Sequence, residues 1–205
     1  MYKHILILLA IAACYNMQAQ VFKENHRVKI GVMYGWADQS PYKEADYSWE
    51  SNQIKLQFSY LLKKGRVFDY EFLSEPQVNI TKFRLFNRTL NLTEEERKAN
   101  KVVDQEHLLE YGITNGILFR HHLTKYLSTY GIISFGALYL GDSTARLPKG
   151  INFASQASLG ISLQTFKKTS FDIRAGIRHL SNAGLKSPNS GVNTFHVETG
   201  FMISL

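Results

Sequence analysis

The chain has 205 residues, a formal net charge of +7, 44% hydrophobic residues and a single cysteine. This length favours one domain with its own core, and the charged fraction of 20% with many aromatic residues argues against disorder. One cysteine excludes a disulfide framework and a cysteine-rich zinc site, and the sequence has no run of 18 apolar residues that could form a transmembrane helix. Taken alone, the mean hydropathy of −0.20 points to a soluble protein.

The first segment, 1–19, has the layout of a secretory signal peptide. Lys3 gives it a polar start, an unbroken apolar run covers 5–13, and Ala19 is the expected cleavage point. Cys14 follows Ile-Ala-Ala, which resembles a bacterial lipoprotein processing site. A lipid anchor on Cys14 is therefore the alternative to simple cleavage.

The remaining chain, 20–205, shows the period-two alternation of apolar and polar residues that is typical of β-strands. In the last part of the chain, for example, Val197, Phe201 and Ile203 alternate with small or polar residues. The alternation predicts eight strands, at 27–37, 51–62, 66–76, 107–120, 126–141, 153–166, 171–182 and 192–205.

Short and long connections alternate between these strands. The short ones are 63–65, 124–125 and 167–170, and the long ones are 38–50, 77–106, 142–152 and 183–191. An even number of strands, with short turns at one end and long outer loops at the other, is typical of an outer-membrane barrel. We therefore expect an all-β fold, an eight-stranded antiparallel transmembrane β-barrel with apolar residues toward lipid and small polar residues inside. A soluble eight-stranded barrel, with the apolar stripe inside, is the alternative, but the aromatic stripe that ends at the C-terminus favours the membrane barrel.

Three polar residues break the alternation near the ends of the last two strands. In 171–182 the odd positions form the apolar, lipid-facing set, which places His179 and Ser181 on that face. Asn193, in the next strand, belongs to the same face. Polar groups that face the bilayer are costly and usually functional, so these residues are the strongest candidates for a site.

Their chemistry suits nucleophilic catalysis. Residues i and i+2 of a strand share a face and lie about 6.6 Å apart at Cα, so His179 can reach Ser181 and accept its proton. Asn193 can then orient the imidazole, and Asn182 could bind an oxyanion by its amide or its backbone N–H. The alternative is that His179 and Ser181 lie at the level of the lipid headgroups and only contact water.

The segment Arg178–Gly191, RHLSNAGLKSPNSG, resembles the C-terminal motif of the lipid A 3-O-deacylase (PagL-like) family, also termed acyloxyacyl hydrolases. Members of that family are eight-stranded outer-membrane barrels that hydrolyse the ester-linked acyl chain at position 3 of lipid A with a Ser-His-Glu triad. The resemblance implies that Ser181 is the nucleophile, His179 the base and Asn182 the oxyanion donor.

The sequence departs from the family at the acid, because Asn193 stands where the family has glutamate. A neutral amide can orient an imidazole but cannot offset the charge of an imidazolium. The outer membrane phospholipase A family uses a Ser-His-Asn triad on the lipid face of a barrel, so a phospholipase or another lipid esterase is an alternative activity. Glu198 is the rival third residue, but by parity it faces inward, roughly 16 Å from Asn193 along the strand.

From these features we expect an outer-membrane serine esterase that is exported by its signal peptide. Its substrate would be lipid A of lipopolysaccharide, it would work as a monomer among outer-membrane lipids, and it would need no cofactor or metal. His121 and His122 are adjacent and so point to opposite faces of a strand, which disfavours a metal site. The positive charge could suit nucleic acid, but an exported chain rarely meets it, so we expect the charge to face lipopolysaccharide phosphates instead. A non-catalytic barrel with structural or adhesive loops is the alternative from another class of function.

Overall fold

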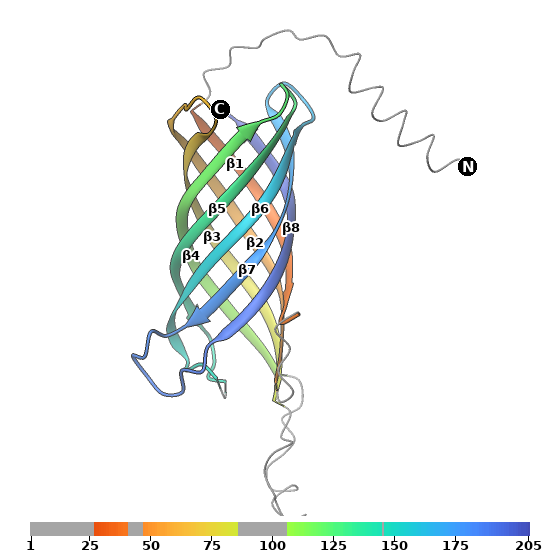
Figure 1. The fold of residues 1–205 in the computed structure, drawn as a ribbon. Helices are drawn as coiled ribbons and strands as arrows, with labels where there is room; N and C mark the ends of the chain where they lie inside the picture. The colour runs from red at the N-terminus through yellow and green to blue at the C-terminus, as the bar shows by residue number, and fades with distance from the viewer. Residues whose placement is uncertain (1–26, 41–46, 86–105, 145) are drawn as a thin grey trace, which may run out of the picture.

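The computed structural model describes residues 27–40, 47–85, 106–144 and 146–205. They form a closed antiparallel barrel of eight strands in chain order, in which the last strand pairs with the first (Figure 1). The strands are β1 (Val28–Asp38), β2 (Tyr47–Lys63), β3 (Asp69–Leu85), β4 (Glu106–His122), β5 (Leu127–Leu140), β6 (Gly150–Gln164), β7 (Thr169–Ser181) and β8 (Val192–Ser204). The predicted fold class is confirmed.

The two ends of the barrel differ. The tight turns after β2, β4 and β6 lie at the end that holds the C-terminus, and the longer connections after β5 and β7 lie at the opposite end (Figure 1). Within the described ranges, no helix is long and apolar enough to cross a membrane. The predicted signal peptide, 1–19, lies outside the described residues.

β3 is longer than predicted. The predicted loop spans 77–106, but β3 continues to Leu85 and β4 begins at Glu106. Pro76 has no N–H to donate, which favours the end of a strand, and the pairing of β2 with β3 is interrupted next to it. Pairing resumes beyond Pro76 because Val78 and the residues after it alternate outward and inward as in the rest of the wall.

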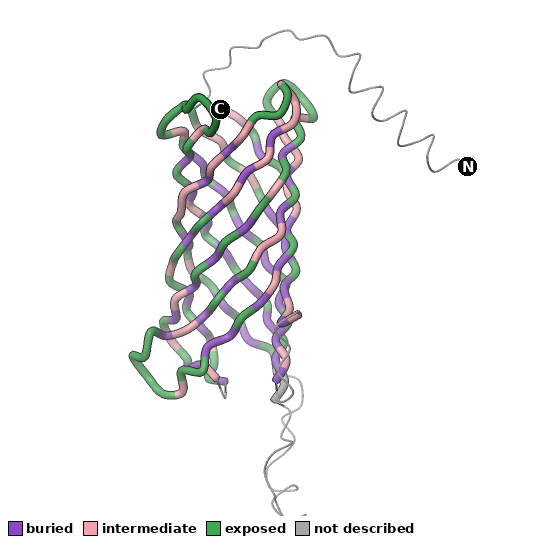
Figure 2. Tube along the Cα trace, in the orientation of Figure 1, coloured by how far each residue is buried: buried purple, intermediate pink, exposed green. Residues whose placement is uncertain are grey.

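The apolar side chains of the strands face away from the barrel axis. Figure 2 shows buried and exposed residues alternating along the strands of the barrel wall. Ile133 is 65% exposed and Leu159 is 76% exposed, whereas their neighbours Ile132 and Ser158 are buried. This apolar outer wall matches the expected lipid-facing surface and contradicts the soluble-barrel alternative.

The interior holds large charged residues in addition to the small polar ones that the sequence predicts. At mid-height, Arg174 donates to Glu198 from Nε at 2.6 Å and to Glu75 from Nη2 at 2.7 Å. Lys55 donates to the other carboxylate oxygen of Glu198 at 2.7 Å. All four side chains are almost fully buried, and their two positive and two negative charges balance. Alternation predicts that these residues face inward, but only the closed barrel brings them together.

The barrel end that carries the β7–β8 connection is filled by apolar side chains. Leu180 faces inward there, completely buried, and Leu147 enters from the β5–β6 connection. This apolar plug consists of Tyr47, Trp49, Phe83, Leu108, Leu138, Leu140, Leu147, Ala154, Leu180 and Val192. The plug supports, from inside, the strand ends that carry His179, Ser181 and Asn193 on the outer face.

Candidate active site

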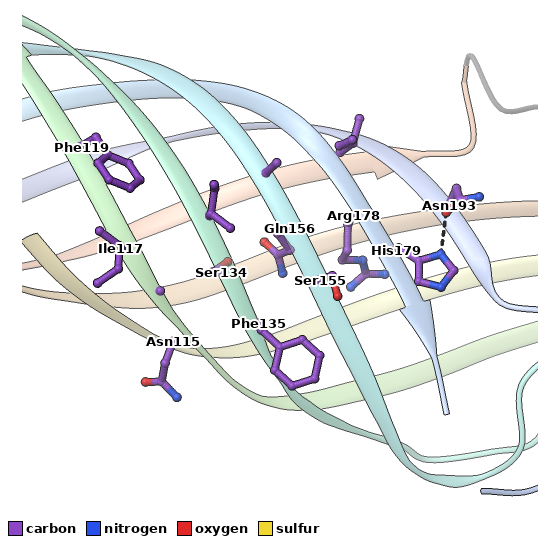
Figure 3. Close-up of a pocket in the computed structure, with 14 residues that line it drawn as sticks. Asn115, Ile117, Phe119, Ser134, Phe135, Ser155, Gln156, Arg178, His179 and Asn193 are labelled. Carbon is purple, nitrogen blue, oxygen red and sulfur yellow. Dashed lines mark hydrogen bonds between the residues drawn. The ribbon is translucent and has the colours of Figure 1, made fainter. Parts of the chain in front are cut away.

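His179 and Asn193 are joined by a hydrogen bond on the outer face of the barrel (Figure 3). The two residues lie opposite each other in the β7–β8 register, and His179 Nδ1 is 2.7 Å from Asn193 Oδ1. An amide oxygen only accepts hydrogen bonds, so His179 Nδ1 carries the hydrogen and donates it. His179 Nε2 is then the unprotonated nitrogen of the neutral ring, which is the form that a general base requires.

Ser181 is the last residue of β7, two positions after His179 and on the same outward face. It is half-buried and lies opposite Phe153 of β6. Its hydroxyl makes no hydrogen bond with any residue of the described ranges. The Ser181 side chain is thus free to rotate. Its Cα lies about 6.6 Å from the Cα of His179, so the hydroxyl can reach the imidazole by rotation of the side chain.

Asn182 has a different environment from the other three predicted residues. Its Nδ2 donates to the Lys186 carbonyl at 2.6 Å, and its Oδ1 accepts the Gly184 N–H at 2.9 Å. Its own backbone N–H donates to Asn189 Oδ1 at 2.8 Å. These bonds brace the β7–β8 connection from within and lend no support to the predicted oxyanion role, which stays a prediction.

Glu198, the rival third residue, faces the interior of the barrel. It is 1% exposed and is engaged by Lys55 and Arg174, so the wall separates it from His179. Of the two alternatives that the sequence left open, the structure places only Asn193 against the imidazole. Among the described residues, no group of three or more His, Cys, Asp or Glu side chains could hold a metal ion.

An apolar groove of about 780 Å³ crosses the outer wall from β4 to β8, and His179 and Asn193 line one part of it (Figure 3). Ser181 does not line it but follows directly along β7. A second groove of about 430 Å³ shares several of the same side chains and continues over Leu159 and Ala175. The shared apolar lining consists of Phe119, Ile133, Ala157 and Ile177. The candidate site therefore adjoins a long apolar surface depression rather than an enclosed pocket.

Two further outward-facing polar residues, which were not predicted from the sequence, line this groove. Ser155 lies opposite His179 in the β6–β7 register, and Asn115 of β4 lines the groove farther from the site. Parity along β6 marks Ser155 as outward, because it shares the face of Leu159. However, the pairing that places Ser155 beside His179 depends on the register between strands, which a single sequence does not give.

Comparisons with known proteins agree with this architecture. The family model for lipid A 3-O-deacylase (PagL) matches residues 15–202. The crystal structure of the outer membrane enzyme PagL has a TM-score of 0.54 at 14% identity, covering 86% of this chain and 99% of that one. OprG from Pseudomonas aeruginosa has a TM-score of 0.48 at 9% identity, covering 87% and 96%. No curated protein sequence matches the chain.

At 14% identity the PagL structure shows the fold alone, whereas the family model spans almost the whole chain. The chain therefore belongs to the lipid A 3-O-deacylase (PagL) family of outer-membrane β-barrels.

Proposed function

We propose that this protein is a serine esterase that removes the 3-O-linked acyl chain from lipid A in the outer membrane. The observation that carries the proposal is the His179–Asn193 hydrogen bond on the lipid-facing wall, beside the apolar groove. A lipid substrate reaches this face by diffusion within the membrane, without leaving it. Family membership supports lipid A as the substrate.

In the proposed reaction, Ser181 Oγ attacks the carbonyl carbon of the acyl ester while His179 Nε2 accepts the hydroxyl proton. The tetrahedral intermediate collapses by breaking the bond to the sugar oxygen, which takes the proton from His179. Water then attacks the acyl-enzyme, with His179 again as base, and the fatty acid and free Ser181 are released. Asn193 Oδ1 holds Nδ1–H throughout, which fixes the orientation of the ring.

The groove supports a specific placement of the substrate. Its apolar side chains, such as Ile133 and Ile177, suit the hydrocarbon of the cleaved acyl chain. Ser155, beside the imidazole, would contact the more polar part of the lipid near the ester. The sugar would then lie toward the β7–β8 connection, where Lys186 is exposed and can approach a phosphate.

A neutral third residue fits this location. A carboxylate at position 193 would place an ionised group on the outer wall with only the neutral imidazole of His179 beside it, which is costly in a lipid environment. An amide can orient the imidazole without that cost, but it gives the transient imidazolium less electrostatic support. We therefore expect Asn193 to act mainly by holding the ring.

Replacing Asn193 by leucine should lower kcat because Nδ1–H loses its acceptor and the ring loses its preferred tautomer. In serine proteases, loss of the orienting carboxylate costs about 10⁴ in rate, and we expect about 10²- to 10⁴-fold here because the wild-type partner is neutral. Asn193→Glu, which restores an acceptor and supplies a charge, should retain activity. Fatty-acid release from purified lipid A measures both, and wild-type kcat in Asn193→Leu would contradict the role of Asn193.

The phospholipase alternative is favoured by one observation, the asparagine in the third position. It is tested by giving the purified protein lipid A and phosphatidylethanolamine separately, in the same detergent. We expect lipid A to lose one acyl chain and the phospholipid to stay intact. Release from phospholipid alone would replace lipid A as the substrate, and release from neither would contradict an esterase.

A further inference from the structure

We infer that Arg146, in the β5–β6 connection, is a positioning residue that holds the backbone of Gly191 against the imidazole of His179. The inference rests on the proposed function, in which His179 is the base. Arg146 does not touch the candidate triad, so its effect would pass through the β7–β8 connection.

Gly191 borders the edge of His179 that the reaction uses. A Cβ atom at Gly191 would lie 3.0 Å from His179 Cε1 and 3.6 Å from Nε2. The φ angle of Gly191 is 68°, a conformation that side-chain-bearing residues rarely adopt. Glycine is therefore needed here both for its backbone conformation and for space beside Cε1 of the imidazole, so a shift of this backbone toward the ring would displace the imidazole.

Arg146 fixes the position of this backbone. Its Nε donates to the Gly191 carbonyl at 2.8 Å, and its Nη2 donates to the Ser190 carbonyl at 3.3 Å. In return, the Ser190 N–H donates to the Arg146 carbonyl at 3.1 Å. Three hydrogen bonds thus join the β5–β6 connection to the two residues that precede β8.

Arg146 is itself held by the barrel. Its guanidinium lies 5.3 Å from the ring centre of Tyr47, a buried residue of the apolar plug. The next residue, Leu147, is completely buried in the same plug, and Thr144 Oγ1 accepts the N–H groups of both Arg146 and Leu147. Because Arg146 is held in this way, its guanidinium fixes the position of the Gly191 backbone relative to the barrel end and to His179.

Catalysis depends on how firmly the imidazole is held. Nε2 must meet the Ser181 hydroxyl in a defined direction, and small displacements of a catalytic group cost much rate. Asn193 fixes the ring from the Nδ1 side, while Gly191 limits it on the Cε1–Nε2 side. Removing the guanidinium should loosen the imidazole only on the side that faces Gly191. It should therefore lower kcat with little change in KM.

The test compares purified wild type with Arg146→Met, which keeps an apolar stem near Tyr47 but removes every donor. With lipid A as substrate we expect kcat to fall about 10- to 100-fold at unchanged KM. Arg146→Lys, which keeps a charge and one donor, should recover part of kcat, and added millimolar guanidinium chloride should partly restore Arg146→Met. The rate at which a fluorophosphonate labels Ser181 should fall by a similar factor in Arg146→Met. This rate does not depend on lipid binding, so it reports on the reactivity of the serine alone.

Lys149→Ala is the matched control, since Lys149 is an exposed cation of the same connection whose pair with Asp142 is long, at 3.8 Å. It should keep the wild-type kcat.

Wild-type kcat and labelling in Arg146→Met would overturn the inference while the esterase proposal stands. A fall that neither lysine nor guanidinium restores would show a structural role and also overturn it. Absence of fatty-acid release by wild type would instead refute the proposed function. If Arg146→Met does not fold, Gly191→Ala decides by the same measurements, because its Cβ would lie 3.0 Å from His179 Cε1 while Arg146 stays in place. Wild-type kcat in Gly191→Ala would overturn the inference.

Discussion

Ser181→Ala should abolish release of fatty acid from lipid A while the barrel stays folded. The hydroxyl makes no hydrogen bond within the described ranges and lies on the outer wall, so its removal costs the fold little. The reaction, in contrast, loses its nucleophile, which lowers kcat by about 10⁴-fold or more in triad enzymes. Mass spectrometry of the released fatty acid gives the rate, and the heat-modifiable mobility typical of folded barrels reports the fold.

Ser155→Ala is the informative companion to this variant. Ser155 is the other outward serine beside His179, lying directly opposite it across the β6–β7 pair. If Ser181 is the nucleophile, Ser155→Ala should lower activity only several-fold, through weaker contact with the polar part of the lipid. The reverse result, in which Ser155→Ala is inactive and Ser181→Ala is active, would assign the nucleophile to Ser155.

Arg174→Met should destabilise the barrel by about 3–5 kcal/mol, the usual cost of removing one member of a buried charge network. Arg174 neutralises Glu75 and Glu198 inside the barrel, where both carboxylates are 1% exposed. Without it, Lys55 alone faces two buried negative charges. Urea unfolding in lipid vesicles, followed by tryptophan fluorescence, measures the change in the free energy of unfolding.

Two comparisons make this stability prediction specific. Lys149→Ala removes an exposed ion pair and should change stability by less than about 1 kcal/mol. Adding Glu75→Gln to Arg174→Met restores neutrality between Lys55 and Glu198 and should recover part of the loss. Stability equal to wild type in Arg174→Met would show that the interior network contributes little to the fold.

Much of the fold can be predicted from alternation. Tyr34 and Trp36 in β1, or Val197 and Phe201 in β8, face outward as the period-two pattern predicts. The alternation of short and long connections likewise predicts the order of strands around the barrel. These features are local consequences of side chains that point to opposite faces in turn, so one sequence suffices to find them.

Other features depend on contacts between distant segments. The predicted strand stops at Pro76, which has no N–H to donate, and the alternation after it is weak. In the barrel, β3 continues to Leu85 because β2 and β4 pair with the extended part on both sides. Leu180 is an apolar residue at a position where the alternation predicts a polar interior. The structure explains it, because Leu180 packs in the same apolar cluster as Leu147 of the β5–β6 connection. Local patterns do not contain such information.

The candidate site shows the same division. The outward placement of His179, Ser181 and Asn193 follows from parity, and the hydrogen bond between His179 and Asn193 follows once β7 and β8 are paired. In contrast, the bracing of Asn182 by Lys186 and Asn189 comes from the conformation of a connection that no periodicity describes. For the same reason, Arg146 carries no signal in the sequence that relates it to His179.

The placement of the site on the outer wall also explains why mean hydropathy misleads for this chain. Many apolar residues of the wall alternate with polar or small residues that face the interior, so the average of −0.20 hides a continuous apolar surface. On such a surface a few polar side chains are conspicuous, and here three of them lie together at the end of β7 and the start of β8.

The most direct test of the proposed function is the mass of lipid A in cells that produce either the wild-type chain or Ser181→Ala. Fragmentation in the mass spectrometer assigns each acyl chain to its position on the sugar. We expect lipid A lighter by one acyl chain, lost from position 3, with the wild type and intact lipid A with the variant. Identical lipid A in both cultures, with both proteins folded in the outer membrane, would contradict the proposed deacylase.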